Sequence, residues 1–274
     1  MGMLLVRLLS AAVPVIAILV AAAFLLPADF PRLPRQLLLT AIGVGGTAIA
    51  EIVMFRTPLD DLAARLGFSV PKTRIVVVSV AASLPMWLFL PVASVVTGTP
   101  LHVASNWLLI ILGVVLVNGL AEEVIHRAFF FGHLRDRTSF SKAASLSAAL
   151  FGAQHLYLVA TIGLAGVASV VLALLLAYPL CRIFEMGGRS IVGPAILHTS
   201  SNAAFLVFGE PSNSALLMAH MLVVLISIYS VFLVRRRPLI SGQQTGLRPR
   251  WPAAGETGPP PPTRKLAEGP SKSS

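Results

Sequence analysis

Residues 107–131 of this chain read WLLIILGVVLVNGLAEEVIHRAFFF, an apolar run interrupted by one short charged stretch. No charge occurs before Glu122, and then Glu123, His126 and Arg127 follow within five positions. A run of this length can cross a bilayer as a helix, which takes about 20 residues. Ionisable side chains are costly at that depth and are normally paired or kept for function. The stretch therefore predicts a membrane helix that carries a buried polar site.

The composition of the whole chain points to a membrane protein. Of its 274 residues, 56% are hydrophobic and only 12% are charged, and the mean hydropathy is +0.84. A soluble domain is about 25% charged, so a chain this apolar is expected to be integral to a membrane. The net charge of +10 does not indicate nucleic acid as a partner, because the Lys and Arg residues fall between apolar spans and in the tail. A single cysteine, Cys181, excludes an intramolecular disulfide and is expected to pack as a small apolar residue.

Seven further apolar spans are long enough to cross a bilayer. They run at about 8–26, 37–55, 75–96, 143–164, 165–183, 191–208 and 215–234. The first is expected to be a retained anchor rather than a cleaved signal peptide, because its apolar run is long and no clear small-x-small cleavage site follows it. The predicted fold class is all-α: a polytopic membrane helix bundle of about eight transmembrane helices with a polar cavity.

The placement of basic residues predicts the orientation of this bundle. With the N-terminus in the cytoplasm, only Arg32 and Arg35 of the 21 Lys and Arg residues fall on the outer side. Membrane proteins keep Lys and Arg in cytoplasmic loops. We therefore expect an integral protein of the cell (plasma) membrane whose N- and C-termini are both cytoplasmic. Residues 60–66, in the second connection, are typical of a short amphipathic helix at the membrane interface.

The charged stretch itself indicates one paired and one unpaired carboxylate. Glu123 and Arg127 are four residues apart on a helix, with the acid N-terminal, which is the favourable order for an ion pair. Glu122 projects about 100° away from Glu123 on an α-helix. It is left without a cation on its own helix, which makes it a candidate general base.

Two more polar clusters lie inside other spans. Phe151 and His155 share a face of the fifth span, and His198 and Asn202 share a face of the seventh. Counting about 1.5 Å per residue from the span ends places Glu122 and His198 at similar depths. The same count places His155 higher, by roughly 8–10 Å. A carboxylate and one imidazole can hold and deprotonate a water, while the other imidazole and the amide can donate to an oxyanion. The set predicts hydrolysis of a peptide bond in or near the membrane.

These clusters resemble the motifs of the CPBP family of intramembrane metalloproteases, which comprises CAAX-type prenyl proteases and Abi or bacteriocin-processing proteins. The resemblance covers about residues 107–208. It is carried by three motifs in order on three spans, namely Glu122-Glu123-x-x-x-Arg127, Phe151-x-x-x-His155 and His198-x-x-x-Asn202. The sequence differs from the family pattern at His126, where an aromatic residue is common, and at Ala128, where Gly often follows the Arg.

The resemblance implies an endopeptidase that uses a Glu-activated water. By motif, Glu122 is the base, His155 positions the water or a metal, and His198 and Asn202 stabilise the oxyanion. Glu123 and Arg127 support the catalytic set. The implied cofactor is a divalent metal, zinc, held by Glu122, His155 and His198, although a Glu and two His can also work without metal. The implied partners are membrane lipids and a membrane-associated peptide or protein substrate, either prenylated or bacteriocin-like.

Three regions are expected along the chain. Residues 1–100 form N-terminal transmembrane helices, and residues 101–237 form a CAAX-protease-like catalytic core. Residues 238–274 form a basic, Pro- and Gly-rich tail that cannot bury apolar area and is expected to be disordered.

Other functions compete with the protease. A non-catalytic immunity or scaffold protein that binds a peptide in the same cavity is the main alternative. A small transporter would need a polar path across the whole bilayer, and the outer halves of the spans offer little beyond Asn118. Glu123-Val124-Ile125-His126 matches the Glu-x-x-His of di-iron bundles, but the second copy that such a site requires does not occur in the sequence. Glu51 is expected to snorkel or to pair with a cytoplasmic Arg. No functional role is expected for His102, His133 and His220, which fall in a loop, at a span end and in a span without polar partners.

Overall fold

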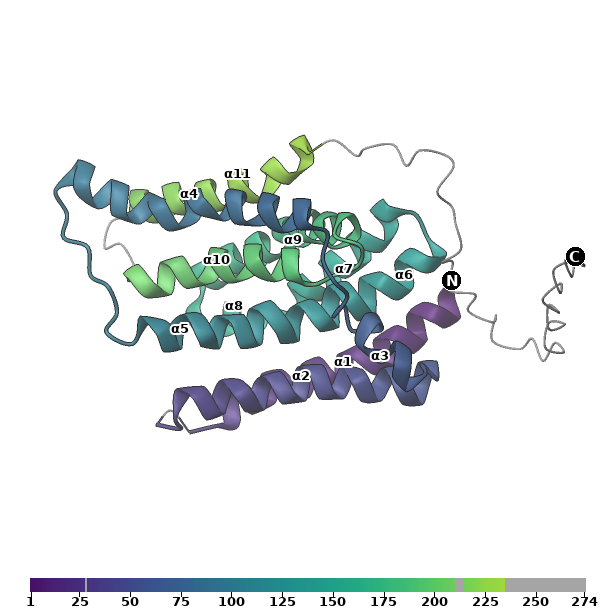
Figure 1. The fold of residues 1–274 in the computed structure, drawn as a ribbon. Coiled ribbons are helices and arrows are strands. Elements are labelled where there is room, and N and C mark those ends of the chain that lie inside the picture. The colour runs from purple at the N-terminus through teal and green to yellow at the C-terminus, as the bar shows by residue number, and fades with distance from the viewer. Residues whose placement is uncertain (28, 210–213, 235–274) are drawn as a thin grey trace, which may run out of the picture. The chain divides into compact units, whose positions relative to one another are not determined.

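The chain folds into a polytopic helical bundle, as Figure 1 shows. The structure is a computed structural model that describes residues 1–27, 29–209 and 214–234, and every regular element within those ranges is a helix. Seven of the helices there are long and apolar enough to cross a membrane, and a shorter apolar helix, α10, spans Val192–Phe208. The prediction of about eight membrane helices is confirmed. The tail predicted at 238–274 lies outside the described residues.

The helical spans follow the predicted order with small shifts in their ends. A first hairpin is formed by α1 (Gly2–Leu25) and α2 (Arg32–Phe55). The predicted interfacial helix is α3 (Leu59–Arg65), and it leads into α4 (Thr73–Thr97). Later spans are α9 (Leu164–Met186), α10, and α11 (Ser214–Tyr229), which continues as a short 3₁₀ helix, η3 (Ser230–Leu233).

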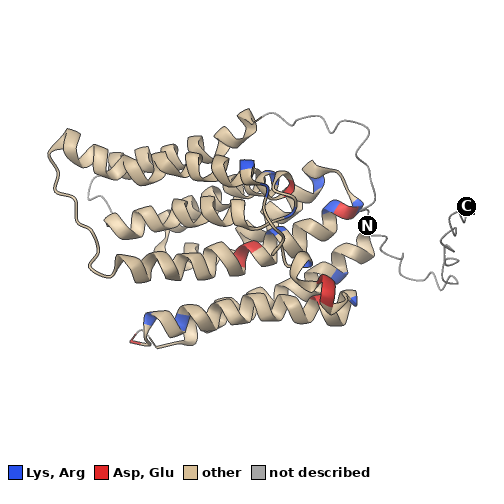
Figure 2. Cartoon of the chain, in the orientation of Figure 1, with Lys and Arg blue, Asp and Glu red and all other residues tan. Residues whose placement is uncertain are grey.

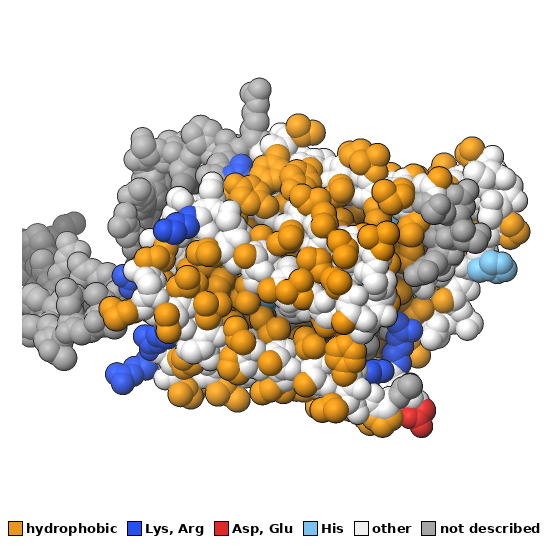
Figure 3. All heavy atoms as spheres, turned by 180° about the vertical axis from the view of Figure 1, so that it is seen from behind, with side chains coloured by type: hydrophobic (Ala, Val, Ile, Leu, Met, Phe, Trp, Pro, Cys, Tyr) orange, Lys and Arg blue, Asp and Glu red, His pale blue; other side chains and the backbone are white. Residues whose placement is uncertain are grey.

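Charged side chains gather at one end of the bundle, which also holds the N-terminus (Figure 2). The space-filling view shows a broad hydrophobic belt with basic side chains at its two ends (Figure 3). Many large apolar residues on this surface are exposed, including Leu25, Val53 and Leu164. Such a belt is what a hydrocarbon environment requires, and the chain is an integral membrane protein.

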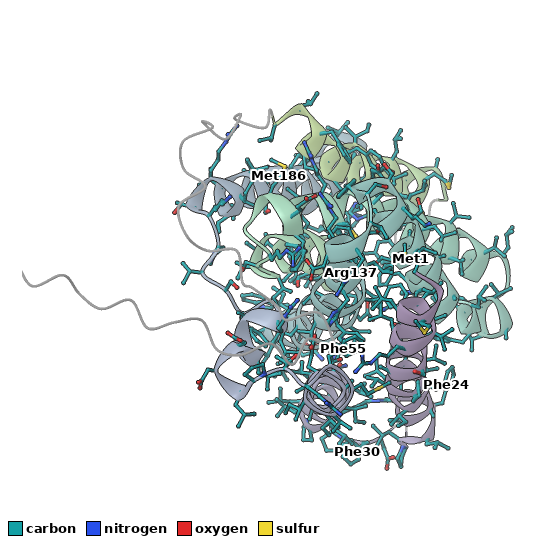
Figure 4. The ribbon with its side chains drawn as sticks, turned by 90° about the vertical axis from the view of Figure 1, so that its right-hand side faces the viewer. Met1, Phe24, Phe30, Phe55, Arg137 and Met186 are labelled. Carbon is teal, nitrogen blue, oxygen red and sulfur yellow. The ribbon has the colours of Figure 1, made fainter. Side chains whose placement is uncertain are left out.

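The packing order brings the three motif-bearing helices together. The α1–α2 hairpin lies along one side of the bundle, as seen from the end that carries Met1, Phe55, Arg137 and Met186 (Figure 4). α4 packs against α10, α7 packs against α9, and α2 packs against the span 107–137. The span 107–137 in turn contacts both α7 and α10. It is therefore the central helix of the site.

The span 107–137 is one continuous helix whose middle is not α-helical. It begins as α5 (Trp107–Val114), passes through two π-helical segments, η1 (Val115–Glu122) and η2 (Val124–Phe131), and ends as α6 (Gly132–Arg137). A π-helix bonds residue i to i+5 and widens the turn, and it occurs frequently at functional sites. The expectation of an α-helix here is wrong, and the rotation of 100° between Glu122 and Glu123 does not apply.

The fifth span is also not a single helix. α7 (Phe140–Gln154) ends at His155, and α8 (Tyr157–Ile162) begins after a two-residue turn. The N–H of His155 bonds to the carbonyl of Gly152, which is the tight closure of a helix end. The span predicted at 143–164 is present as Phe140–Ile162, but a turn interrupts it. His155 therefore lies at the end of α7 rather than inside a helix.

Glu51 is buried at the charged end, and its partner is not an arginine. His133 Nε2 lies 2.9 Å from Glu51 Oε1, and the Thr57 hydroxyl donates to Glu51 Oε2 at 2.7 Å. The His133 ring also packs on Phe55 with centroids 4.1 Å apart. These contacts join α2 to the end of the central helix. The expected snorkelling or arginine pair of Glu51 is replaced by a histidine contact.

Close packing between the central helix and α10 gives a first testable prediction. A methyl group at Gly119 would lie 2.8 Å from Thr199 Oγ1, whereas one at Gly45 would meet nothing within 4 Å. Gly119→Ala is expected to lower the free energy of unfolding by about 1–3 kcal/mol relative to the control Gly45→Ala, because overpacking forces the backbones apart. Thermal unfolding in detergent micelles measures the difference. Equal unfolding temperatures for the two variants would contradict the packing described.

Candidate active site

The imidazole of His198 lies between the two neighbouring glutamates of the central helix. Its Nδ1 is 2.7 Å from Glu123 Oε1, and its Nε2 is 3.7 Å from Glu122 Oε2. Glu122 and His198 are 6% and 3% exposed, and Glu123 is fully buried. The wider π-helical turn allows consecutive carboxylates to reach opposite edges of one ring. This is the arrangement that α-helical geometry did not predict.

The predicted ion pair of Glu123 with Arg127 is present and buried. Arg127 Nε lies 3.2 Å from Glu123 Oε2, and both side chains are fully inaccessible. The guanidinium also lies over the ring of Phe151, 4.4 Å from its centroid. The buried Arg127 nitrogens form no hydrogen bond to other described residues. The cost of burying this charge is therefore offset by the ion pair with Glu123 and by the aromatic face of Phe151. Arg127 is the cation that faces Glu123.

The contact with Glu123 decides which nitrogen of His198 carries the proton. An ionised carboxylate only accepts hydrogen bonds, so the Nδ1–H of His198 donates to Glu123. In the neutral ring Nε2 is then an acceptor, and it faces Glu122 Oε2, which is another acceptor and forms no hydrogen bond among the described residues. A water about 2.8 Å from both atoms is compatible with their 3.7 Å separation. Such a water would donate one hydrogen to each.

Phe151 joins the remaining motif residues to this centre. Its ring centroid is 5.6 Å from that of His198 and 4.7 Å from that of His155, in edge-to-face contacts. His155 Nδ1 lies 2.7 Å from the Phe151 carbonyl oxygen. Because a carbonyl only accepts, Nδ1 carries the hydrogen and Nε2 of His155 stays available. The two imidazoles therefore share one aromatic neighbour, despite the difference in depth predicted for them.

Asn202 reaches the site through the backbone of its own helix. Its Nδ2 donates to the carbonyl oxygen of His198 at 3.2 Å, and the side chain is partly exposed. Contacts thus connect Glu122, Glu123, Arg127, His198 and Asn202 directly. His155 joins them only through Phe151, and no direct contact between His155 and Glu122 is described.

The carboxylates and the imidazole of His198 are buried, with Glu122 6% and His198 3% exposed. A groove of about 500 Å³ does lie in the structure, but it is apolar and runs between α4 and α11. Its walls include Val78, Ala82, Pro85, Val223 and Ile226. The polar centre is elsewhere in the bundle.

The three side chains predicted to bind zinc do not form a preformed zinc site. A catalytic zinc takes three protein ligands in near-tetrahedral geometry, and no cluster of three His, Cys, Asp or Glu residues with metal-binding geometry occurs in the described ranges. Glu122 and His198 approach each other, but His155 does not complete the set with them.

Sequence reasoning gave no role to two polar residues beside the motifs. His126 Nε2 lies 2.6 Å from Gln154 Oε1, and His126 is fully buried. His126 is one of the departures from the family pattern, yet it and Ala128 are closely packed. The signal was visible in the sequence, because an amide immediately before His155 and an imidazole immediately before Arg127 both fall in apolar spans.

Comparison with known proteins supports the family resemblance. No curated protein matches the chain. The family described as type II CAAX prenyl endopeptidase Rce1-like matches residues 103–204, the segment that contains all three motifs. With the polar centre and the helical bundle in place, residues 103–204 are similar to the Rce1-like CAAX endopeptidase family.

Proposed function

We propose that the protein is an intramembrane endopeptidase in which Glu122 activates a water to hydrolyse a peptide bond in or near the membrane. One observation carries this proposal: the His198 ring is fixed by Glu123 on one edge and faces the unbonded Glu122 oxygen with the other. Glu122 Oε2 and His198 Nε2 are both acceptors, and a donor placed between them would satisfy both. Water is such a donor, and it is also the nucleophile that hydrolysis needs.

The reaction follows from the hydrogen bonds of that water. Its two hydrogens point to Glu122 and to Nε2 of His198, so its lone pairs point away, toward a substrate carbonyl carbon. As the oxygen–carbon bond forms, Glu122 takes one proton and the carbonyl oxygen becomes an oxyanion. Glu122 then gives the proton to the amide nitrogen as the carbon–nitrogen bond breaks. The products are a carboxyl group and an amine.

The other motif residues receive supporting roles. Glu123, compensated by Arg127, holds the Nδ1–H tautomer and the orientation of His198. Asn202 uses one amide hydrogen for the His198 carbonyl, and its second is free to stabilise the oxyanion together with His155. In this assignment His198 holds the water and His155 faces the oxyanion, which exchanges the roles that the family motif suggested, because the contact with Glu122 belongs to His198.

The proposed substrate is a prenylated peptide that ends in a CAAX sequence and lies in the inner leaflet. The name of the matching family supports this choice, and a lipidated peptide would partition into the bilayer next to the apolar belt. We place the protein in the cell membrane with both termini cytoplasmic, because charges gather at the end that holds the N-terminus.

The test is cleavage by the full chain in liposomes. A farnesylated CAAX peptide, the same peptide without the lipid, and a transmembrane peptide are compared by mass spectrometry of the products. We expect cleavage of the farnesylated peptide at the CAAX bond and at least tenfold slower cleavage of the unmodified one. Faster cleavage of the transmembrane peptide would show that the preferred substrate is not prenylated. If none of the three peptides is cleaved faster than by the Glu122→Gln variant, the proposed protease function is wrong.

A further inference from the structure

His126 is held at two points by one neighbouring helix. Its ring Nε2 donates to Gln154 Oε1 at 2.6 Å, and its backbone carbonyl accepts from the hydroxyl of Ser147 at 3.0 Å. Ser147 and Gln154 are seven residues apart on α7, which is two helical turns. All three side chains are buried. One residue of the central helix thus bonds to one face of α7 at two heights.

The two ends of this connection lie beside reacting groups. His126 belongs to the π-helical segment η2, directly before Arg127 and three positions after Glu123. Gln154 is the last residue of α7 and directly precedes His155, where the helix ends. Between them the His126 ring packs edge-to-face on Phe151, with centroids 4.8 Å apart. The bond therefore spans the gap between the carboxylate-bearing helix and the turn that carries the second imidazole.

We propose that the His126–Gln154 pair is a positioning device that fixes His155 at the end of α7 relative to Glu122 on the central helix. The inference rests on the proposed peptidase function. A helix end has no further turn to hold it, so the direction of its last side chains is set by what they bond to. The bond from His155 Nδ1 to the Phe151 carbonyl orients the ring within α7. The short N–H···O bond from His126 to Gln154 instead fixes the end of α7 relative to the central helix.

A second feature favours a positioning role over simple space filling. Nδ1 of His126 is buried and forms no hydrogen bond among the described residues. An apolar side chain of the same shape would avoid the cost of this unpartnered acceptor. An imidazole is therefore less favourable than an apolar side chain for packing at this position. What the imidazole adds is the directional hydrogen bond to Gln154.

The experiment compares five variants with the wild-type chain in liposomes. His126→Phe and Gln154→Leu each leave one buried partner unpaired, and the double variant His126→Phe/Gln154→Leu removes both. His126→Gln keeps an N–H donor at the same reach. His220→Phe is the matched control, because the His220 ring packs between Phe89 and Phe205 and neither of its nitrogens forms a hydrogen bond among the described residues.

We expect both single variants to lose thermal stability and about tenfold in kcat, in the range typical for supporting residues around a catalytic group. The double variant should regain stability, since no buried partner is left unpaired, while its kcat stays low and its KM is unchanged. His126→Gln and His220→Phe should keep wild-type kcat. Recovery of kcat together with stability in the double variant would overturn the positioning role. A wild-type chain with no activity above Glu122→Gln would instead overturn the peptidase itself.

Discussion

Glu122→Gln is expected to lower kcat by about 10²–10⁴-fold, the range for loss of a general base, while leaving the fold intact. The amide has the shape of the carboxylate but cannot take a proton from water. The carboxylate oxygen Oε2 forms no hydrogen bond to other described residues and only approaches His198 at 3.7 Å, so little native structure depends on its charge. Steady-state cleavage of the preferred membrane peptide, with thermal unfolding of the same sample, measures both effects.

Asp60→Asn is the matched control, because Asp60 is an exposed acid of α3 at the charged end of the bundle. It should retain both activity and stability. Full activity of Glu122→Gln would show that Glu122 is not the general base, and the proposed reaction would be wrong. A chain that binds a membrane peptide equally well with and without the Glu122 charge, and cleaves it in neither case, would instead fit the immunity or scaffold role.

The second large effect is expected on stability, at the buried ion pair. Glu123→Gln leaves the fully buried Arg127 guanidinium without its counter-charge, and Arg127→Met leaves the Glu123 carboxylate without its cation. Removing one partner of a buried pair typically costs about 3–5 kcal/mol, while replacing both can be close to neutral. The double variant Glu123→Gln/Arg127→Met should therefore be more stable than either single variant.

Unfolding in mixed micelles, followed by circular dichroism, gives the four free energies of a double-mutant cycle, those of the wild type, the two single variants and the double variant. Strong coupling between the two positions is the expected result. If the losses in the free energy of unfolding of the two single variants simply add in the double variant, the two charges do not compensate each other. The role assigned to the Glu123–Arg127 pair in holding His198 would then be wrong. Arg65→Gln/Asp136→Asn provides a comparison, since that ion pair, 3.1 Å long, is partly accessible to solvent and should couple by less than about 1 kcal/mol.

Much of the fold could be predicted because hydrocarbon imposes simple requirements on sequence. The length of each apolar span and the uneven distribution of Lys and Arg between the loops were enough to predict about eight membrane helices. The Glu123–Arg127 pair followed from spacing alone, and it forms even though the helix is π-helical there. Both predictions depend on local patterns that tertiary contacts do not reverse.

The geometry around His198 could not be predicted in the same way. Residues 115–131 give no local sign of hydrogen bonding from i to i+5, and the segment that adopts it packs against α2, α7 and α10. The end of α7 at His155 likewise lacks a local sign, because no Pro or Gly stands at that position. Glu51 contacts His133, which is 82 residues away in sequence. Such a contact depends on which helices are neighbours in the fold.

The first helical hairpin meets the central helix at two levels. Gly43 lies so close to Ala121 that a methyl group on it would be 2.7 Å from the Ala121 Cβ, and Glu51 holds His133 further along. Ala121 directly precedes the proposed base. A fragment limited to the family-matched segment 103–204 would therefore lack both contacts. A shortened chain without residues 1–58 would turn the bare flank of Ala121 and the polar ring of His133 toward lipid.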